Sequence, residues 1–145
     1  MPLIRRARAR DAALLRAITR EAYAKWVVAI GREPAPMADD FEARAASGEA
    51  WLLGEDALCI LEEAPGALLL DNIAVRPAAQ GRGLGRQLIA FAEREARSRG
   101  HLALRLYTNA RMDTNLALYA RLGFHETHRE ATGFGTRVWL EKAVP

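Results

Sequence analysis

The sequence predicts a single α/β (α+β) domain that spans residues 1–145 and is built on a mixed sheet. Two observations predict it: a run of short apolar segments separated by turn signals in the middle of the chain, and one strand–helix–strand unit that follows them. Hairpin strands that feed one such unit give a sheet with both antiparallel and parallel pairs. A chain of 145 residues is long enough to bury one core and too short for two full-size domains.

The first third of the chain predicts one short strand and two helices. Residues 3–7 form the strand, and Asp11 then acts as an N-cap, because its short side chain accepts hydrogen bonds from first-turn amides. Apolar residues recur at helical spacing as far as Trp26, and Gly31 ends that helix. Residues 39–46 predict a second, weaker helix.

The rest of the chain alternates strands with two further helices. Apolar runs predict strands at residues 50–53, 57–61, 67–75, 102–107, 124–128 and 138–140. A helix opens at the glycines from Gly81 to Gly85 and stops at Gly100, and a shorter one covers residues 113–122.

Composition excludes several classes of function. The net charge of +3 is too small and too evenly spread for a nucleic-acid surface. No apolar run approaches the roughly 20 residues that a membrane helix needs, and the N-terminus lacks the apolar segment of a secretory signal. The single cysteine, Cys59, cannot pair within the chain, and no Cys/His cluster has zinc spacing, so we expect no metal. A reducing, cytoplasmic setting is the default expectation.

The most informative stretch is the turn between the strand at residues 67–75 and the next helix. Three alternate glycines, Gly81, Gly83 and Gly85, start that helix, and Arg82 and Arg86 add positive charge beside them. Free amides at a helix start point outward, and the helix dipole adds partial positive charge there. Glycines let the backbone approach a ligand without Cβ clashes. The turn therefore predicts a site for a diphosphate.

Other interpretations of this turn fit less well. The dinucleotide fingerprint is G-x-G-x-x-G, whereas the spacing here is G-x-G-x-G, and no acidic residue closes a following strand to hold a ribose. The Gly-Lys-Ser/Thr sequence of nucleotide P-loops is missing. Glycines that serve packing alone stay open as an alternative at this point.

Three elements of the sequence resemble the GCN5-related N-acetyltransferase (GNAT) superfamily. The segment QGRGLG, from Gln80 to Gly85, is similar to the family signature Q/R-x-x-G-x-G/A, and NIAVRP at residues 72–77 resembles the strand that leads into it. The segment LYARLGF at residues 118–124 resembles the L-Y-x-x-x-G-F element, at the usual separation. The resemblance runs from about residue 3 to residue 142 and implies a mostly antiparallel central sheet with helices on both faces.

The resemblance implies acetyl-coenzyme A (acetyl-CoA) as co-substrate. It places the pyrophosphate on the amides of the glycine turn and the pantetheine arm along the edge of the preceding strand, where the sheet opens. Met112 stands where relatives often carry a pantetheine-contacting asparagine, and Asn109 or Asn115 would compensate. The implied coenzyme-binding residues are Ile73, Ala74, Val75, Gln80, Gly81, Arg82, Gly83, Leu84, Gly85, Arg86 and Asn115.

The resemblance also implies direct attack of an amine on the thioester, without a covalent enzyme intermediate. Tyr119 matches the tyrosine that protonates the departing thiolate, and a neutral phenol can donate to sulfur. The place where some relatives carry a carboxylate base falls near Tyr107, which is no base at neutral pH. Asp71 is the best-placed carboxylate for a general base, ahead of Glu62 and Glu63. Deprotonation through a water chain, or without a dedicated base, stays open.

We expect the acceptor side of the site in the first two helices and the loop between them. The side chains that could line it are Tyr23, Trp26, Arg32, Glu33 and Met37. At the other end of the chain, residues 132–137 are expected to close over the site, with Phe134 between two glycines as a flap.

The expected function is therefore an acetyl-CoA-dependent N-acetyltransferase that acts on a primary amine of a small molecule or peptide. The alternative is a catalytically silent acyl-CoA-binding or sensor module of the same fold; a dinucleotide-binding protein is disfavoured by the glycine spacing. Homodimers are common in the family, and no nucleic-acid or membrane partner is expected. The sequence identifies neither the acceptor nor a preference for acetyl over longer acyl groups.

Overall fold

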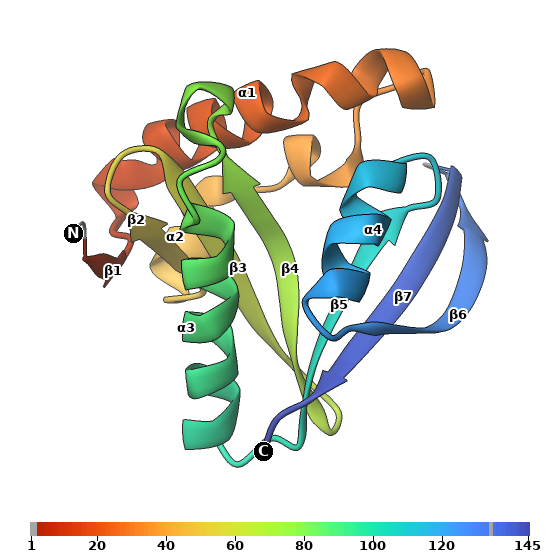
Figure 1. The fold of residues 1–145 in the computed structure, drawn as a ribbon. Helices are drawn as coiled ribbons and strands as arrows, with labels where there is room; N and C mark the ends of the chain where they lie inside the picture. Colours follow the sequence, from red (N-terminus) through yellow and green to blue (C-terminus); the bar gives the residue numbers. More distant parts are fainter. Residues whose placement is uncertain (1–2, 134) are drawn as a thin grey trace.

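In the part of the chain that the structure describes, seven strands form one sheet, and helices lie against both of its faces (Figure 1). The computed structural model describes residues 3–133 and 135–145. The strands are β1 (Ile4–Arg6), β2 (Ala50–Leu53), β3 (Ala57–Ala64), β4 (Ala67–Val75), β5 (Ala103–Asn109), β6 (His125–Thr132) and β7 (Gly135–Ala143). The α-helices are α1 (Ala12–Ile30), α2 (Phe41–Ala46), α3 (Leu84–Ser98) and α4 (Asp113–Arg121). Short 3₁₀ helices are η1 (Ala9–Asp11), η2 (Ala35–Ala38) and η3 (Pro77–Ala79).

The strands lie side by side in the order β1-β2-β3-β4-β5-β7-β6. The pair β4–β5 is parallel and is joined through α3, whereas the other neighbouring pairs are antiparallel. The predicted fold class, a mixed and mostly antiparallel sheet with helices on both faces, is confirmed. No described helix has the length and apolar character needed to cross a bilayer.

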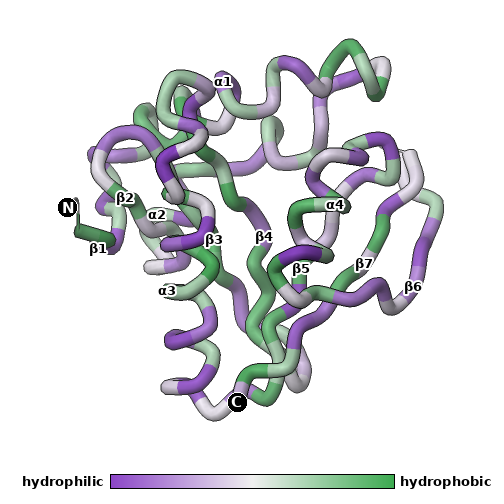
Figure 2. The backbone as a smooth tube through the Cα atoms, viewed as in Figure 1, coloured by the Kyte–Doolittle hydropathy of each residue, from purple (hydrophilic) through white to green (hydrophobic). Residues whose placement is uncertain are grey.

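Two apolar layers hold the helices to the sheet. On one face, Leu88 of α3 packs in the same cluster as Cys59 of β3. On the other face, Leu15 of α1 and Phe41 of α2 pack with Ile60 of β3. Neighbouring β3 residues thus enter opposite layers, as the period-two alternation of a strand requires. In Figure 2, hydrophobic segments follow the central strands, whereas β6 is mainly hydrophilic.

Strand β4 changes its surroundings at Asp71. Ile60 and Leu61 of β3 face Asn72 and Leu70, which leaves Asp71 as the extra residue of a β-bulge. The parallel pairing with β5 ends at Leu70. Beyond that point β4 and β5 diverge toward the end of the sheet where α1 crosses (Figure 1), so that in the described structure the rest of β4 is paired with β3 alone.

The largest difference from the sequence prediction is the C-terminal hairpin. Strands β6 and β7 are much longer than the predicted strands at residues 124–128 and 138–140. All of β6 except its last residue is exposed, so this strand lacks the alternating buried side chains by which a strand is recognised. Phe134, predicted as a flap, lies outside the described residues.

Asp11 occupies the predicted N-cap position of α1, but its side chain does not make the predicted capping bond. Its carboxylate accepts from the Arg8 amide at 2.8 Å and from the Arg5 guanidinium at 2.9 and 3.0 Å, and it makes no capping bond to α1. The side chain therefore closes η1 and ties β1 to the start of α1. The hydrogen bonds from Arg5 and Arg8 lower the pKa of Asp11 to about 2.

We predict that Asp11→Asn lowers the free energy of unfolding by about 1–2 kcal/mol at neutral pH, a discounted value because Arg5 is half exposed. The folded-state pKa lies below the unfolded value of about 3.9, so the stabilisation is present above that value and is lost as the pH falls toward about 2. Urea unfolding of both proteins at stepwise lower pH will show their stabilities converging. A difference that stays constant over this range would contradict the assignment.

Candidate active site

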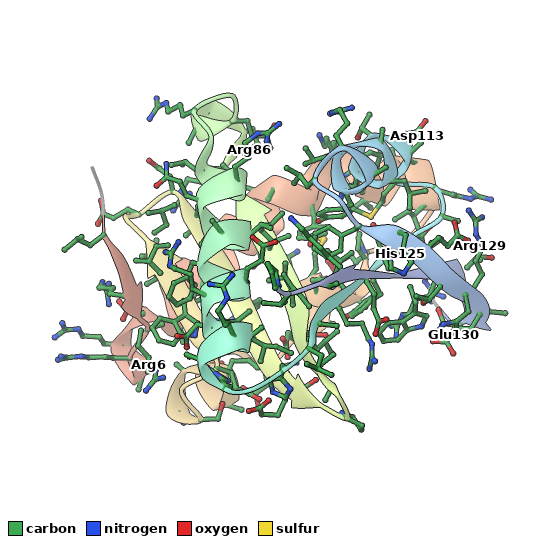
Figure 3. The ribbon with its side chains drawn as sticks, turned by 60° about the horizontal axis from the view of Figure 1, so that its bottom comes forward. Arg6, Arg86, Asp113, His125, Arg129 and Glu130 are labelled. Carbon is green, nitrogen blue, oxygen red and sulfur yellow. The ribbon has the colours of Figure 1, made fainter. Side chains whose placement is uncertain are left out.

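The turn before α3 folds as a glycine-lined cradle. Gly81 and Gly83 have φ angles of 86° and 79°, in the left-handed region that favours glycine, and α3 begins directly after them. A Cβ placed on Gly81, Gly83 or Gly85 meets no heavy atom of the described chain within 4 Å. Packing inside the described protein therefore does not explain the glycines, and the first amides of α3 have room in front of them for an anion. Figure 3 shows Arg86 at this end of α3.

A cavity lies beside this turn, between α1, β4, α3 and α4; we call it the glycine-turn cavity. The residues that line it are Ala22, Tyr23, Lys25, Trp26, Ile73, Ala74, Val75, Ala79, Gln80, Gly81, Gly83, Leu84, Gly85, Arg86, Ile89, Asn115, Leu118, Tyr119 and Leu122. Of the residues predicted to hold the coenzyme, Arg82 is the one that does not line this cavity, and it is exposed. The structure thus brings the remaining predicted residues together in one place.

The open edge of β4 forms one wall of this cavity. Backbone groups alternate in direction along a strand. The Arg76 amide donates toward the segment before β3 at 2.8 Å, whereas the carbonyls of Ile73 and Val75 turn to the open side. There they accept from the Tyr23 hydroxyl at 3.3 Å and from Nε2 of Gln80 at 3.2 Å. An extended ligand that bears amides would meet Ile73 and Val75 at this edge.

A second cavity opens where β4 and β5 diverge; we call it the tyrosine-lined cavity. The residues that line it are Tyr23, Pro34, Ala35, Pro36, Leu70, Asp71, Asn72, Ile73, Leu106, Tyr107, Thr108, Asn109, Met112, Asn115, Tyr119, Thr132, Thr136 and Arg137. Tyr23, Ile73, Asn115 and Tyr119 line both cavities. The site therefore has two chambers that meet at these four residues.

Tyr119 of α4 stands at the junction. It is 7% exposed and packs edge-on against Phe124, with ring centroids 5.8 Å apart. Burial raises the pKa of Tyr119 to about 12, so the hydroxyl keeps its proton at neutral pH. In the described chain no hydrogen bond engages this hydroxyl, which leaves it available to a ligand.

Asp71 is held by Arg44 of α2. Nη2 of Arg44 donates to Oδ2 of Asp71 at 2.7 Å, and the same guanidinium pairs with Asp39, Glu49 and Glu62 at 3.0 to 3.3 Å. The guanidinium is largely buried, with 16% of the side chain exposed. One positive charge thus faces four carboxylates, and this acidic cluster carries an excess of negative charge.

Tyr107 of β5 lies near Asp71 across the gap between the strands, and its hydroxyl stabilises the ionised carboxylate. Burial raises the pKa of Asp71 above its usual range, although the charge of Arg44 and the Tyr107 hydroxyl oppose the shift. Burial and the neighbouring Asp71 charge raise the pKa of Tyr107 as well. One wall of the tyrosine-lined cavity therefore holds a proton acceptor of raised pKa beside a neutral hydroxyl.

Several residues expected on the acceptor side lie elsewhere. Trp26 lines the glycine-turn cavity, Met37 is buried, and Glu33 pairs with Arg20 at 3.2 Å. Arg32 lines neither cavity. The described part of α1 faces mainly the glycine-turn cavity, which Ala22, Tyr23, Lys25 and Trp26 line, whereas Tyr23 also lines the tyrosine-lined cavity. The loop after α1 does contribute to the tyrosine-lined cavity, through Pro34, Ala35 and Pro36.

Sequence reasoning missed two contributors to the site, Arg44 and Asn72. Arg137 belongs to the segment that was expected to close over the site, and it lines the tyrosine-lined cavity together with Thr132 and Thr136. Arg44 carried no signal, because arginine on a short helix is usually solvated. Asn72 did carry one, since it is a polar residue within a strand predicted to be buried. It accepts from the Tyr23 hydroxyl at 3.1 Å and donates to Thr19 at 3.2 Å, which fastens α1 to β4.

The chain is similar to known acetyltransferases in sequence and in structure. The acetyltransferase (GNAT) domain family matches residues 43–126. The [ribosomal protein bS18]-alanine N-acetyltransferase of Salmonella typhimurium strain LT2 is 43% identical over 85 residues, which are 59% of this chain and 55% of that enzyme. The match thus spans about half the length of this curated relative.

Two solved structures share the fold over nearly the whole chain. The ribosomal-protein-S18-alanine N-acetyltransferase from Escherichia coli is similar with a TM-score of 0.75 and 25% identity, over 99% of this chain and 94% of that one. The PaiA N-acetyltransferase from Thermoplasma acidophilum, solved in complex with coenzyme A, has a TM-score of 0.74 and 16% identity over 99% of both chains. Because the family match covers more than half of the sequence, this chain belongs to the acetyltransferase (GNAT) family.

Proposed function

We propose that this protein is an N-acetyltransferase that moves the acetyl group of acetyl-CoA to a primary amine. The observation that carries the proposal is the meeting of two cavities at Tyr119, one beside an anion-binding turn and the other beside a buried carboxylate. Relatives named as N-acetyltransferases, one of them solved with coenzyme A, support it. The acceptor is an amine of a small molecule or of a protein.

The glycine-turn cavity fits the coenzyme. The amides from Gly81 to Arg86 and the dipole of α3 hold the pyrophosphate, and the Arg86 side chain adds formal charge. The backbone of Ile73 and Val75 pairs with the pantetheine arm as an added strand. Asn115 lies where both chambers meet. When bound, the coenzyme supplies a thioester whose carbonyl carbon is attacked by the amine nitrogen.

Tyr119 serves as the general acid. The new C–N bond forms as the C–S bond breaks, and Tyr119 gives its proton to the departing sulfur, so that the products are an amide and a free thiol. Its pKa of about 12 keeps the hydroxyl protonated before the step. The hydroxyl then recovers a proton from solvent.

Asp71 takes the proton that the amine loses. Its raised pKa makes it a stronger base than an exposed aspartate. Tyr107 accepts a hydrogen bond from the amine while it donates to Asp71, so it connects the two. Arg44 fixes the carboxylate at the bulge of β4.

Gly85 provides the test of the coenzyme site. Its backbone lies outside the left-handed region and a Cβ there has room, so both Gly85→Ala and Gly85→Asp should fold with melting temperatures within a few degrees of the parent. We predict that Gly85→Asp raises the acetyl-CoA Kd by about 30-fold or more, because its carboxylate occupies an anion site. Gly85→Ala, which adds bulk without charge, should lose less affinity in calorimetric titration. A folded Gly85→Asp protein that binds as tightly as the parent would disprove the site.

For Tyr119, we predict that Tyr119→Phe lowers kcat by about 10²-fold or more and leaves the acetyl-CoA Kd within about twofold. The phenyl ring keeps the packing against Phe124 and removes only the donor. Thiol release from a panel of amines measures kcat. Unchanged kcat would refute the acid role, and coenzyme binding without turnover of any amine by the parent would favour the sensor alternative.

For Asp71, we predict that Asp71→Asn lowers kcat by about 10²-fold and removes the acid limb of its pH profile. A base must be ionised to act, so activity falls as the pH drops through its pKa, and the raised pKa moves that fall above the usual aspartate value of about 3.9. The matched control is Asp39→Asn, because Asp39 also pairs with Arg44 but does not line the tyrosine-lined cavity. Equal losses of kcat in Asp71→Asn and Asp39→Asn would mean that Asp71 has a structural role and is not the base.

A further inference from the structure

Arg137 of β7 lines the tyrosine-lined cavity. The guanidinium carbon lies 4.1 Å from the ring centroid of Tyr107 and 5.7 Å from that of Trp139. Cation–π contacts of this kind fix the plane and position of a guanidinium. A quarter of the side chain is exposed, so Arg137 is held by the protein and still reachable from the cavity.

The N–H donors of Arg137 are hardly used within the described chain. Among the described residues, the carboxylate that pairs with it is that of Glu130 on the outer strand β6, labelled in Figure 3, at 4.0 Å, beyond hydrogen-bond distance. The same Glu130 oxygen already accepts from Nε1 of Trp139 at 2.9 Å. By contrast, Arg105 on the neighbouring strand donates to Glu141 at 2.7 and 2.9 Å. Arg137 therefore keeps a preorganised fork of donors for a ligand.

The opposite side of Tyr107 carries negative charge. Its hydroxyl stabilises the ionised Asp71, and Asp71 belongs to the acidic cluster in which the Arg44 guanidinium pairs with four carboxylates. The chamber thus has an anionic side at Asp71 and a cationic side at Arg137, with one tyrosine between them. An acceptor that complements both sides carries a basic nitrogen at one end and an anionic group near it.

We infer that the acceptor is an amine that also bears a carboxylate, and that Arg137 is the residue that selects it. This inference rests on the proposed N-acetyltransferase function and narrows its substrate class. Arg137 binds the carboxylate through its fork of donors, while the amine lies toward Asp71 and Tyr107, close to the junction with the glycine-turn cavity. A polyamine would place a second positive charge against Arg137 and is selected against.

Two sources of such an acceptor share this chemistry: a free amino acid, whose own carboxylate is recognised, and a peptide N-terminus followed by an acidic side chain. The experiment compares substrates in matched pairs of two kinds. In the first kind, a free amino acid is compared with its carboxamide. In the second kind, two amidated peptides are compared that differ only in Glu or Gln at the second position. The kcat/KM values are computed per unprotonated amine, because the pKa values of the amines differ within a pair.

We expect the parent enzyme to prefer the carboxylate member of at least one pair by about 10- to 100-fold. Arg137→Gln should abolish that preference by lowering kcat/KM for the carboxylate member more than for the uncharged member, whereas Arg137→Lys should restore part of it. Arg105→Gln is the matched control, because Arg105 does not line the cavity, and it should keep the preference. The pair that shows the effect identifies the source.

Equal rates on both members of each pair, or a preference that survives in Arg137→Gln, would overturn the inference and leave the acetyltransferase function standing. The failure of the function itself looks different. If the parent binds acetyl-CoA but releases no thiol with any member of either pair, nor with a wider panel of amines, both the proposed function and the inference fall.

Discussion

Strand β4 pairs with β5 as far as Leu70 and then leaves it, and the candidate site is arranged around that departure. Backbone groups that lose a neighbouring strand must find other partners, because buried unpaired amides and carbonyls are costly. Here the Tyr23 hydroxyl and the Gln80 side chain donate hydrogen bonds to two carbonyls of β4. Both donors come from segments that line the glycine-turn cavity, so the solution that satisfies the backbone also builds the walls of the site.

The acidic cluster around Arg44 makes the geometry of Asp71 depend on a very short helix. A helix of six residues has little stability of its own, so α2 must be held by its contacts. Its first residue, Phe41, is fully buried, and Arg44 reaches from the helix to the bulge of β4. Buried ion pairs add little net stability, yet removing one partner is costly. The cluster is therefore better understood as a positioning device for Asp71 than as a source of stability.

Much of the fold followed from the sequence, because its main elements have strong local signals. The strands at residues 50–53 and 67–75 have the predicted boundaries, since apolar runs there end at clear turns. The glycine turn could be predicted because the left-handed φ angles at Gly81 and Gly83 favour glycine, and this leaves a visible pattern of glycines in the sequence. Three features could not be predicted, because each depends on contacts between residues far apart in the chain. They are the bulge at Asp71, the crossing of α1 over the opening and the position of Arg137 over Tyr107. The exposed strand β6 was underestimated for the opposite reason, as it buries almost nothing.

The exposure of β6 also affects how strongly the protein tends to self-associate through the edge of its sheet. As the outermost strand of the described sheet, β6 offers a row of backbone donors and acceptors to which a neighbouring chain could add. Glu126, Arg129 and Glu130 place alternating charges along this border, and a stacked copy would have to strip water from each of them. The polar composition that hid β6 from pattern recognition thus discourages fibre-like growth from this side of the protein.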